Sequence, residues 1–209
     1  MFRGDAAAGP AEGDLGGEDT GEGDPMDAIA LLMEEHQLIL GTLDALDSFA
    51  DKVARGGEDR EELGRFLEFI REFADARHHG KEEDILFEVM VEAGFPREGG
   101  PIAVMLMEHE AGRGYVAEVS AKAAQAGRWS PSDRAAVVEA ARGYAELLRQ
   151  HIAKENSILY PMARMRLGPE ALSRVDSACE AFEERHRAAH GTVLEDLARD
   201  LARRNVRGN

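Results

Sequence analysis

The stretch HHGKEEDILF, residues 78–87, places two histidines and three acidic side chains directly before an apolar run. A related stretch, HIAKENSILY, occupies residues 151–160. The first has His78 and Glu82 four residues apart, and the second has a histidine and a glutamate at the same two places. On a helix, residues four apart lie one above the other, so each stretch presents an imidazole and a carboxylate to one point.

The two stretches belong to a longer internal repeat. Two further histidines, His36 and His109, lie 73 residues apart, the same offset that separates the two stretches. Each half of the chain therefore reads H-x41-H-x3-E. The repeated candidate ligands are His36, His78 and Glu82 in the first half, and His109, His151 and Glu155 in the second. This repeat predicts a site of pseudo-two-fold symmetry built by two helical hairpins.

Apolar residues recur at spacings of three and four along most of the chain, which is the period of a helix with one buried face. The predicted helix boundaries are the turn and capping residues Gly56–Gly57, Gly94, Gly127, Ser130 and Gly168. No segment alternates with the period of a strand. We therefore predict an all-α fold: an up-down-up-down four-helix bundle with an additional C-terminal helix, over 170–205, that is broken near Gly191.

Composition divides the chain into three predicted parts. Residues 1–25 contain seven acidic residues, one arginine and few large apolar side chains, so we expect a disordered acidic tail. Residues 26–166 should form the bundle, and residues 167–209 a helical extension.

The predicted site carries one histidine on the apolar face of each bundle helix. A single such histidine is most often a hydrogen-bonded core residue, but four in register favour metal binding. Two carboxylates buried without cations would be very costly, which also favours metal. Imidazole together with carboxylate suits iron or manganese, and zinc less exclusively. We expect two metal ions bridged by the two glutamates.

The composition also excludes some classes of partner. The net charge of −16 disfavours binding to nucleic acid or to an anionic membrane surface. No apolar run approaches the ~20 residues of a membrane span. The single cysteine, Cys179, and the lack of a secretory leader favour a cytoplasmic location. The sequence identifies no protein partner.

With these motifs assembled, the chain resembles the hemerythrin-like (HHE cation-binding) proteins over residues 26 to about 165. The resemblance is carried by MEEH at His36, HHGKEEDILF, LMEHEAGR at His109 and HIAKENSILYP. It implies a four-helix bundle around a non-haem centre of two iron ions, with manganese or zinc less favoured. It further implies His36 and His78 on one iron, His109 and His151 on the other, and Glu82 and Glu155 as bridges.

One departure from the family pattern bears on function. Oxygen-carrying hemerythrins have a fifth histidine four residues after the one that matches His109, and here that residue is Arg113. A guanidinium does not ligate iron. The resulting four-His, two-Glu set is similar to that of the di-iron proteins that repair damaged iron centres, although their usual N-terminal cysteine motif is not found here. We expect an open centre that reacts with or senses O2, peroxide or nitric oxide, with peroxide decomposition as one possible activity. The alternative is a non-enzymatic iron store or sensor module.

Several other polar residues are expected outside the ligand set. His79 lies about 100° around the helix from His78 and matches Ile152 in the repeat, so we expect it on the surface or supporting a ligand. His186 and His190 are spaced for a second metal site, but a solvated helix face is favoured.

The remaining charged and aromatic neighbours are left with two interpretations. The charged residues expected to support ligands or face solvent are Glu35, Lys81, Glu83, Asp84, Glu108 and Glu110. The tyrosines weighed as hydroxyl groups near iron, with core packing favoured, are Tyr115, Tyr144 and Tyr160.

Overall fold

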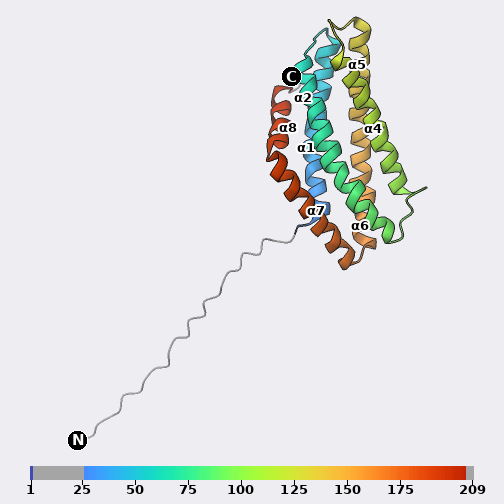
Figure 1. The fold of residues 1–209 in the computed structure, drawn as a ribbon, viewed down its shortest axis with the longest axis vertical. Coiled ribbons are helices and arrows are strands. Elements are labelled where there is room, and N and C mark those ends of the chain that lie inside the picture. Colours follow the sequence, from blue (N-terminus) through green and yellow to red (C-terminus); the bar gives the residue numbers. More distant parts are fainter. Residues whose placement is uncertain (2–25, 206–209) are drawn as a thin grey trace.

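The computed structural model describes Met1 and residues 26–205, and this part of the chain contains helices but no strand. Four antiparallel helical segments form an up-down-up-down bundle (Figure 1). In chain order they are α1 (Ala28–Ala54); α2 (Arg60–Phe69), η1 (Ile70–His79), η2 (Glu82–Leu86) and α3 (Phe87–Glu92); α4 (Pro101–Ala124); and α5 (Pro131–Lys154), η3 (Glu155–Leu159) and α6 (Tyr160–Arg166). The predicted fold class is confirmed.

Two further helices follow the bundle, α7 (Pro169–His190) and α8 (Val193–Arg204). They are separated at Gly191, whose φ of 59° lies in the left-handed region that favours glycine. Both helices pack against α1, and α7 also packs against η2 (Figure 1). The predicted C-terminal helical region is therefore present, with its break near Gly191. The division of residues 167–209 from the bundle as a separate part of the chain stays a prediction. The predicted acidic tail, residues 1–25, lies outside the described residues except for Met1.

Local sequence signals account for the helix ends. The Ser130 hydroxyl accepts a hydrogen bond from the Asp133 backbone N–H, and the Ser130 backbone N–H donates one to the Asp133 carboxylate, so a capping box begins α5. The turn after α1 requires glycine for two reasons. Gly56 has a φ of 98°, and a Cβ on Gly57 would lie 2.8 Å from the Lys52 carbonyl oxygen.

The bundle core is apolar at both ends and polar between them. One apolar cluster contains Leu46, Phe66 and Ala141, and the other contains Leu32, Phe87 and Met105. The predicted ligands lie between these clusters along the sequence of each helix. Apolar packing on both sides therefore fixes the helices that carry them.

The internal repeat extends to the winding of the backbone. Glu82 and Glu155 each begin a five-residue π-helical segment, η2 and η3, and these segments are 73 residues apart. Single π-helical turns are rare and occur often at functional sites. The longer π-helical segment η1 has no counterpart, because the matching residues of α5 are α-helical.

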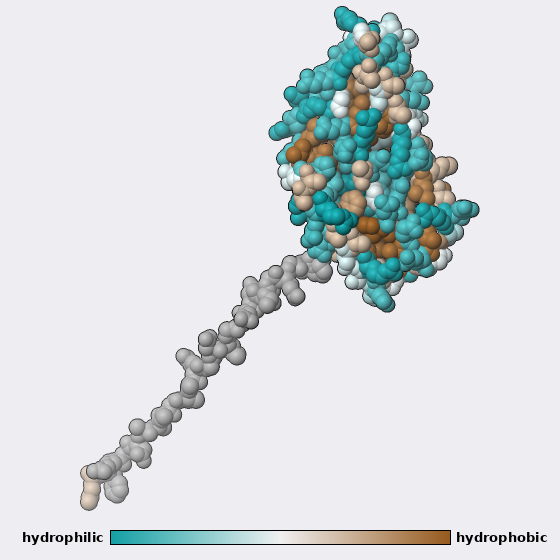
Figure 2. All heavy atoms as spheres, viewed as in Figure 1, coloured by the Kyte–Doolittle hydropathy of each residue, from teal (hydrophilic) through white to brown (hydrophobic). Residues whose placement is uncertain are grey.

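The outer surface of the bundle is mainly hydrophilic. Figure 2 shows teal side chains over most of the face seen in Figure 1, interrupted by smaller hydrophobic areas. None of the helices within residues 26–205 combines the length and apolar character needed to cross a bilayer.

Candidate metal centre

All six predicted ligands meet in the polar layer of the bundle, and a seventh residue, His79, joins them. They come from α1, from the end of η1, from the first residue of η2, from α4, from the end of α5 and from the first residue of η3. None of the seven is more than 5 % exposed. The four helices therefore bring the repeated residues to one buried place.

The first group of potential ligand atoms belongs to His36, His78, Glu82 and Glu155, which all lie within 4.8 Å of one another. The His36 Nε2 atom is 3.2 Å from Glu155 Oε2, and the His78 Nε2 atom is 3.8 Å from Glu82 Oε2. Two imidazoles and two carboxylates thus converge on one point.

The second group contains His79, Glu82, His109 and His151, also within 4.8 Å of one another. The Nε2 atoms of His109 and His151 are 3.0 Å apart, and His109 Nε2 is 3.6 Å from Glu82 Oε2. Glu82 therefore belongs to both groups. Glu155 also lies between them, because its second oxygen is 3.0 Å from His151 Nε2.

The donor set fits a pair of cations. Among the described residues, several buried atoms of the centre lack a hydrogen-bond partner: Nε2 of His36, His78 and His79, Oε2 of Glu82, and both carboxylate oxygens of Glu155. Native proteins pair nearly all buried polar atoms, so this concentration of unpaired donors and acceptors indicates a missing partner. Mixed imidazole and carboxylate ligands suit iron or manganese.

Of the two places expected for His79, the surface or a supporting position beside a ligand, its burial excludes the surface. Its ring stacks on that of His109, with centroids 3.8 Å apart, and its Nε2 atom is buried. The π-helical winding of η1 changes the angle between successive residues, so His78 and His79 both face the interior. A signal existed in the sequence: Ile152, which matches His79, is an apolar residue, and it is buried too.

The far nitrogen of each imidazole is held by an oxygen, again following the repeat. Nδ1 of His78 lies 2.8 Å from Glu35, and Nδ1 of His151 lies 3.0 Å from its counterpart, Glu108. A partner on Nδ1 fixes the tautomer in which Nε2 is free to bind metal. Glu35 and Glu108 thus support ligands.

The other two repeated histidines follow the same arrangement. Nδ1 of His36 lies 2.9 Å from the Asn156 amide oxygen, and Nδ1 of His109 lies 2.6 Å from Glu83. Glu83 therefore supports a ligand, as one of its two interpretations predicted.

The electrostatics of the centre favour the neutral form at His78 and His79, whereas the Glu155 and Glu108 carboxylates outweigh burial and raise the pKa of His151. Burial lowers the pKa of His78 to about 4 and that of His79 to about 3. Burial and the neighbouring Glu155 raise the pKa of Glu82, whereas the adjacent His151 and His36 imidazoles outweigh burial and lower the pKa of Glu155. Two adjacent buried carboxylates do not both ionise readily without a cation.

Lys81 was left with two interpretations, facing solvent or supporting a ligand, and its burial agrees with the second. Its counterpart, Lys154, is partly exposed. The Lys81 ammonium is fully buried and forms ion pairs with Glu35 and with Glu183 of α7. Burial alone would raise the pKa of Glu35, but the His78 imidazole and the Lys81 ammonium lower it to about 2. Lys154 forms the matching ion pair with Glu108, but its side chain is 36 % exposed.

Tyr160 contacts the centre directly. Its hydroxyl donates a hydrogen bond of 2.6 Å to Glu82 Oε1, and its ring stacks on the His36 ring. In the sequence it was only one of three candidate tyrosines. The repeat did not single it out, because the residue 73 positions earlier is Phe87, which has no hydroxyl. Of the other two, Tyr144 lies beside a pocket next to the second group, and Tyr115 packs near Gly143.

Arg113 and the C-terminal histidines lie outside both groups. Arg113 forms ion pairs with Asp75 and Glu83, each at 2.7 Å, and with the exposed Glu110. The rings of His186 and His190 are adjacent on α7, with centroids 4.6 Å apart, but no third potential ligand joins them among the described residues.

Comparison with known proteins gives one match. A family model described as the hemerythrin HHE cation binding domain matches residues 27–163. The match contains all seven residues of the two groups and ends before α7. No curated protein and no solved structure matches the chain.

The difference in burial between Lys81 and Lys154 gives a stability test. Lys81→Met removes the buried ammonium between Glu35 and Glu183 and leaves Arg77 as their cationic partner. We therefore expect a loss of about 3 kcal/mol in the free energy of unfolding, the low end of the cost of breaking a buried ion pair. Lys154→Met, at the partly exposed counterpart, should cost about 0–1 kcal/mol. Urea unfolding of both variants measures the difference, and equal losses would contradict the burial of the Lys81 network.

The low pKa of His79 gives a pH test on metal-free protein. In the unfolded chain this imidazole takes up a proton near pH 6.5, but in the fold it stays neutral down to about pH 3. Stability contributed by the neutral form is therefore lost as pH falls below 6.5.

His79→Ile copies the residue found at the matching position and removes this proton uptake. Between pH 6 and 4.5, wild-type protein should lose stability relative to the variant by roughly 1.4 kcal/mol per pH unit at most. Parallel stability curves from urea unfolding would show that His79 is not buried as described.

Proposed function

The chain belongs to the hemerythrin family of HHE cation-binding domains, and on that premise we propose a non-haem di-iron protein that reacts with O2, peroxide or nitric oxide. The observation that carries this proposal is the pair of overlapping ligand groups that share Glu82. A shared carboxylate is what places two metal ions next to each other in di-iron bundles. Iron bound there would supply redox chemistry, and the protein supplies the ligands and the route of access.

Each metal position has its own set of residues in this proposal. His36 and His78 hold the first iron, His109 and His151 hold the second, and Glu82 and Glu155 bridge. His79 joins the second position as a fifth imidazole, because its Nε2 atom falls within that group. Arg113 stands where oxygen-carrying hemerythrins have their fifth histidine. In this proposal His79, from η1, supplies a fifth imidazole from a different helix.

The two positions differ in their surroundings. Tyr160 stacks on His36 in the first group, and Lys81 and Glu35 link His78 to α7. The second position lies beside a pocket whose wall includes His79 and His109. An external ligand would therefore reach the second iron more readily, which supports reaction at the centre over simple storage.

A second candidate function is a metal-dependent sensor. It is favoured by the ion pairs that run from His78 through Glu35 and Lys81 to Glu183. A change at the first metal position would reach α7 along this path. Hydrogen exchange of α7 in reduced and oxidised protein distinguishes a sensor, which should show a difference, from a centre that acts alone.

Elemental analysis and the visible spectrum test the proposed centre. We expect about two iron ions per chain and a visible absorption that changes when hydrogen peroxide is added. Protein that holds only zinc, or no metal, would rule out the redox function. A stable and reversible oxygen adduct would instead indicate oxygen carriage.

Single substitutions test the assignment of ligands. His78→Ala and Glu82→Ala should lower the iron content, and Glu82→Ala should affect both positions because the carboxylate is shared. His79→Ile should weaken the second position while preserving the packing of the core. His186→Ala, outside both groups, is the matched control and should retain full iron. Unchanged iron in His79→Ile would remove that residue from the ligand set.

A further inference from the structure

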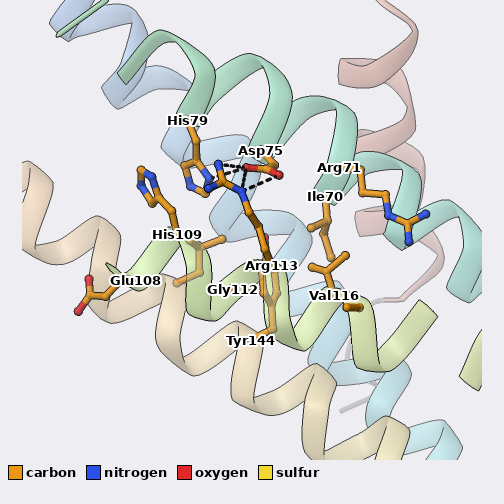
Figure 3. Close-up of a pocket in the computed structure, with 12 residues that line it drawn as sticks. Ile70, Arg71, Asp75, His79, Glu108, His109, Gly112, Arg113, Val116 and Tyr144 are labelled. Atoms are coloured by element: carbon orange, nitrogen blue, oxygen red, sulfur yellow. Dashed lines mark hydrogen bonds and ion pairs between the residues drawn. The ribbon is translucent and has the colours of Figure 1, made fainter. Parts of the chain in front are cut away.

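A pocket of about 220 Å³ lies against the second metal position, between η1, α4 and α5. Its inner wall is formed by His79 and His109, and Figure 3 shows Arg113 reaching across from α4 to Asp75 beside them. A pocket in this place determines which molecules reach the second position. The inference drawn from it rests on the proposed function and deepens it.

The walls of the pocket are mainly apolar. They include Ile70, Val116 and Leu148, together with the ring of Tyr144, which packs near Gly112. An apolar cavity of ~150 Å³ is large enough for benzene, so this pocket has room for a ring with a small branched substituent. It is smaller than most sites for drug-sized ligands.

One polar group inside the pocket lacks a partner. Tyr144 is 4 % exposed, and its hydroxyl has no hydrogen-bond partner among the described residues. Burial raises the pKa of this hydroxyl, so it remains protonated and available as a donor. An unpaired hydroxyl in an apolar pocket indicates a ligand that brings an acceptor oxygen.

The charges around the pocket do not favour an anion. Arg113 is paired with Asp75, Glu83 and Glu110, so its positive charge is already compensated. Glu108 adds a further carboxylate on the same side, paired with Lys154. The remaining cation of the lining, Arg71, donates a hydrogen bond to the Ser120 hydroxyl and points away from His79 and His109 (Figure 3). At the inner end of the pocket, a negatively charged body would therefore meet carboxylates without a free side-chain cation.

We propose that this pocket binds an uncharged organic hydroperoxide, with its apolar body against Ile70, Val116 and Leu148 and its oxygen end towards His79 and His109. The Tyr144 hydroxyl donates a hydrogen bond to that oxygen end. Small neutral molecules such as hydrogen peroxide also fit, but the pocket adds selectivity for an apolar body of about the size of a phenyl group.

The binding test uses 2-phenylpropan-2-ol, the redox-inert alcohol that corresponds to cumene hydroperoxide, and benzenesulfonate, an anion of similar size whose sulfonate group is a poor ligand for iron. Calorimetric titration of the metal-loaded protein should show saturable binding of the alcohol. Benzenesulfonate should bind at least about tenfold more weakly, a difference of about 1.4 kcal/mol. Equal binding of the two probes, or no saturable binding of the alcohol, would overturn the proposal.

Substitutions at two positions fill the pocket. Gly112 lines the pocket beside Tyr144, and a Cβ there would lie 3.6 Å from the Tyr144 ring, an ordinary contact, so the larger side chain of Gly112→Leu is expected to occupy space at this wall. Ala117→Leu narrows the pocket from its exposed side and does not disturb the core. Gly114→Leu is the matched control, because it is exposed and has open space around it.

Both pocket variants should weaken binding of the alcohol by about tenfold or more, whereas the control should bind it as wild type does. Retained binding in both pocket variants would place the probe elsewhere and overturn the proposal. Iron content and the response to hydrogen peroxide are measured on the same samples. An inert centre with normal probe binding would contradict the proposed function alone, and a reactive centre without probe binding would contradict the pocket alone.

Discussion

The burial of two carboxylates among imidazoles, at the middle of an apolar bundle, is the constraint on which the structure depends. Glu82 and Glu155 are both fully buried, and their pKa values are shifted in opposite directions. Such an arrangement is costly unless cations lie between the carboxylates. The apolar clusters above and below the polar layer hold the helices, and oxygens behind the imidazoles hold the rings. The packing of the fold and the arrangement of the candidate centre therefore both serve to hold these buried charged groups in place.

The 73-residue repeat accounts for the ligands of this centre, and the positions where the two halves differ account for its asymmetry. Ligands, the oxygens behind them and the π-helical segments η2 and η3 follow the 73-residue offset. The pairs that break it are His79 with Ile152, Tyr160 with Phe87, and buried Lys81 with half-exposed Lys154. These differences make one metal position enclosed and the other accessible. A centre that is symmetric in its ligands is thus asymmetric in its surroundings.

The bundle and the convergence of the repeated residues could be predicted from the sequence, because the helical period and the uninterrupted repeat depend only on regular helix geometry. The prediction failed where the helix geometry is not regular. The direction of the His79 side chain was predicted from α-helical geometry, but η1 is π-helical. A π-helical segment has no simple signature in the sequence, so this difference could not be predicted. The contact of Lys81 with Glu183 joins residues 102 apart in the chain. Such a pairing depends on how α7 packs, which periodicity does not specify.

The ion pairs of α7 also bear on where this domain ends. Residues 27–163 match the family model, yet the Lys81 ammonium is covered by Glu183, and Arg77 is held by Glu183 and Glu195. A fragment cut at the family boundary would expose these charges to water and raise the local dielectric behind His78. The C-terminal helices therefore shield from water the charged groups beside a centre to which their described residues add no candidate ligand.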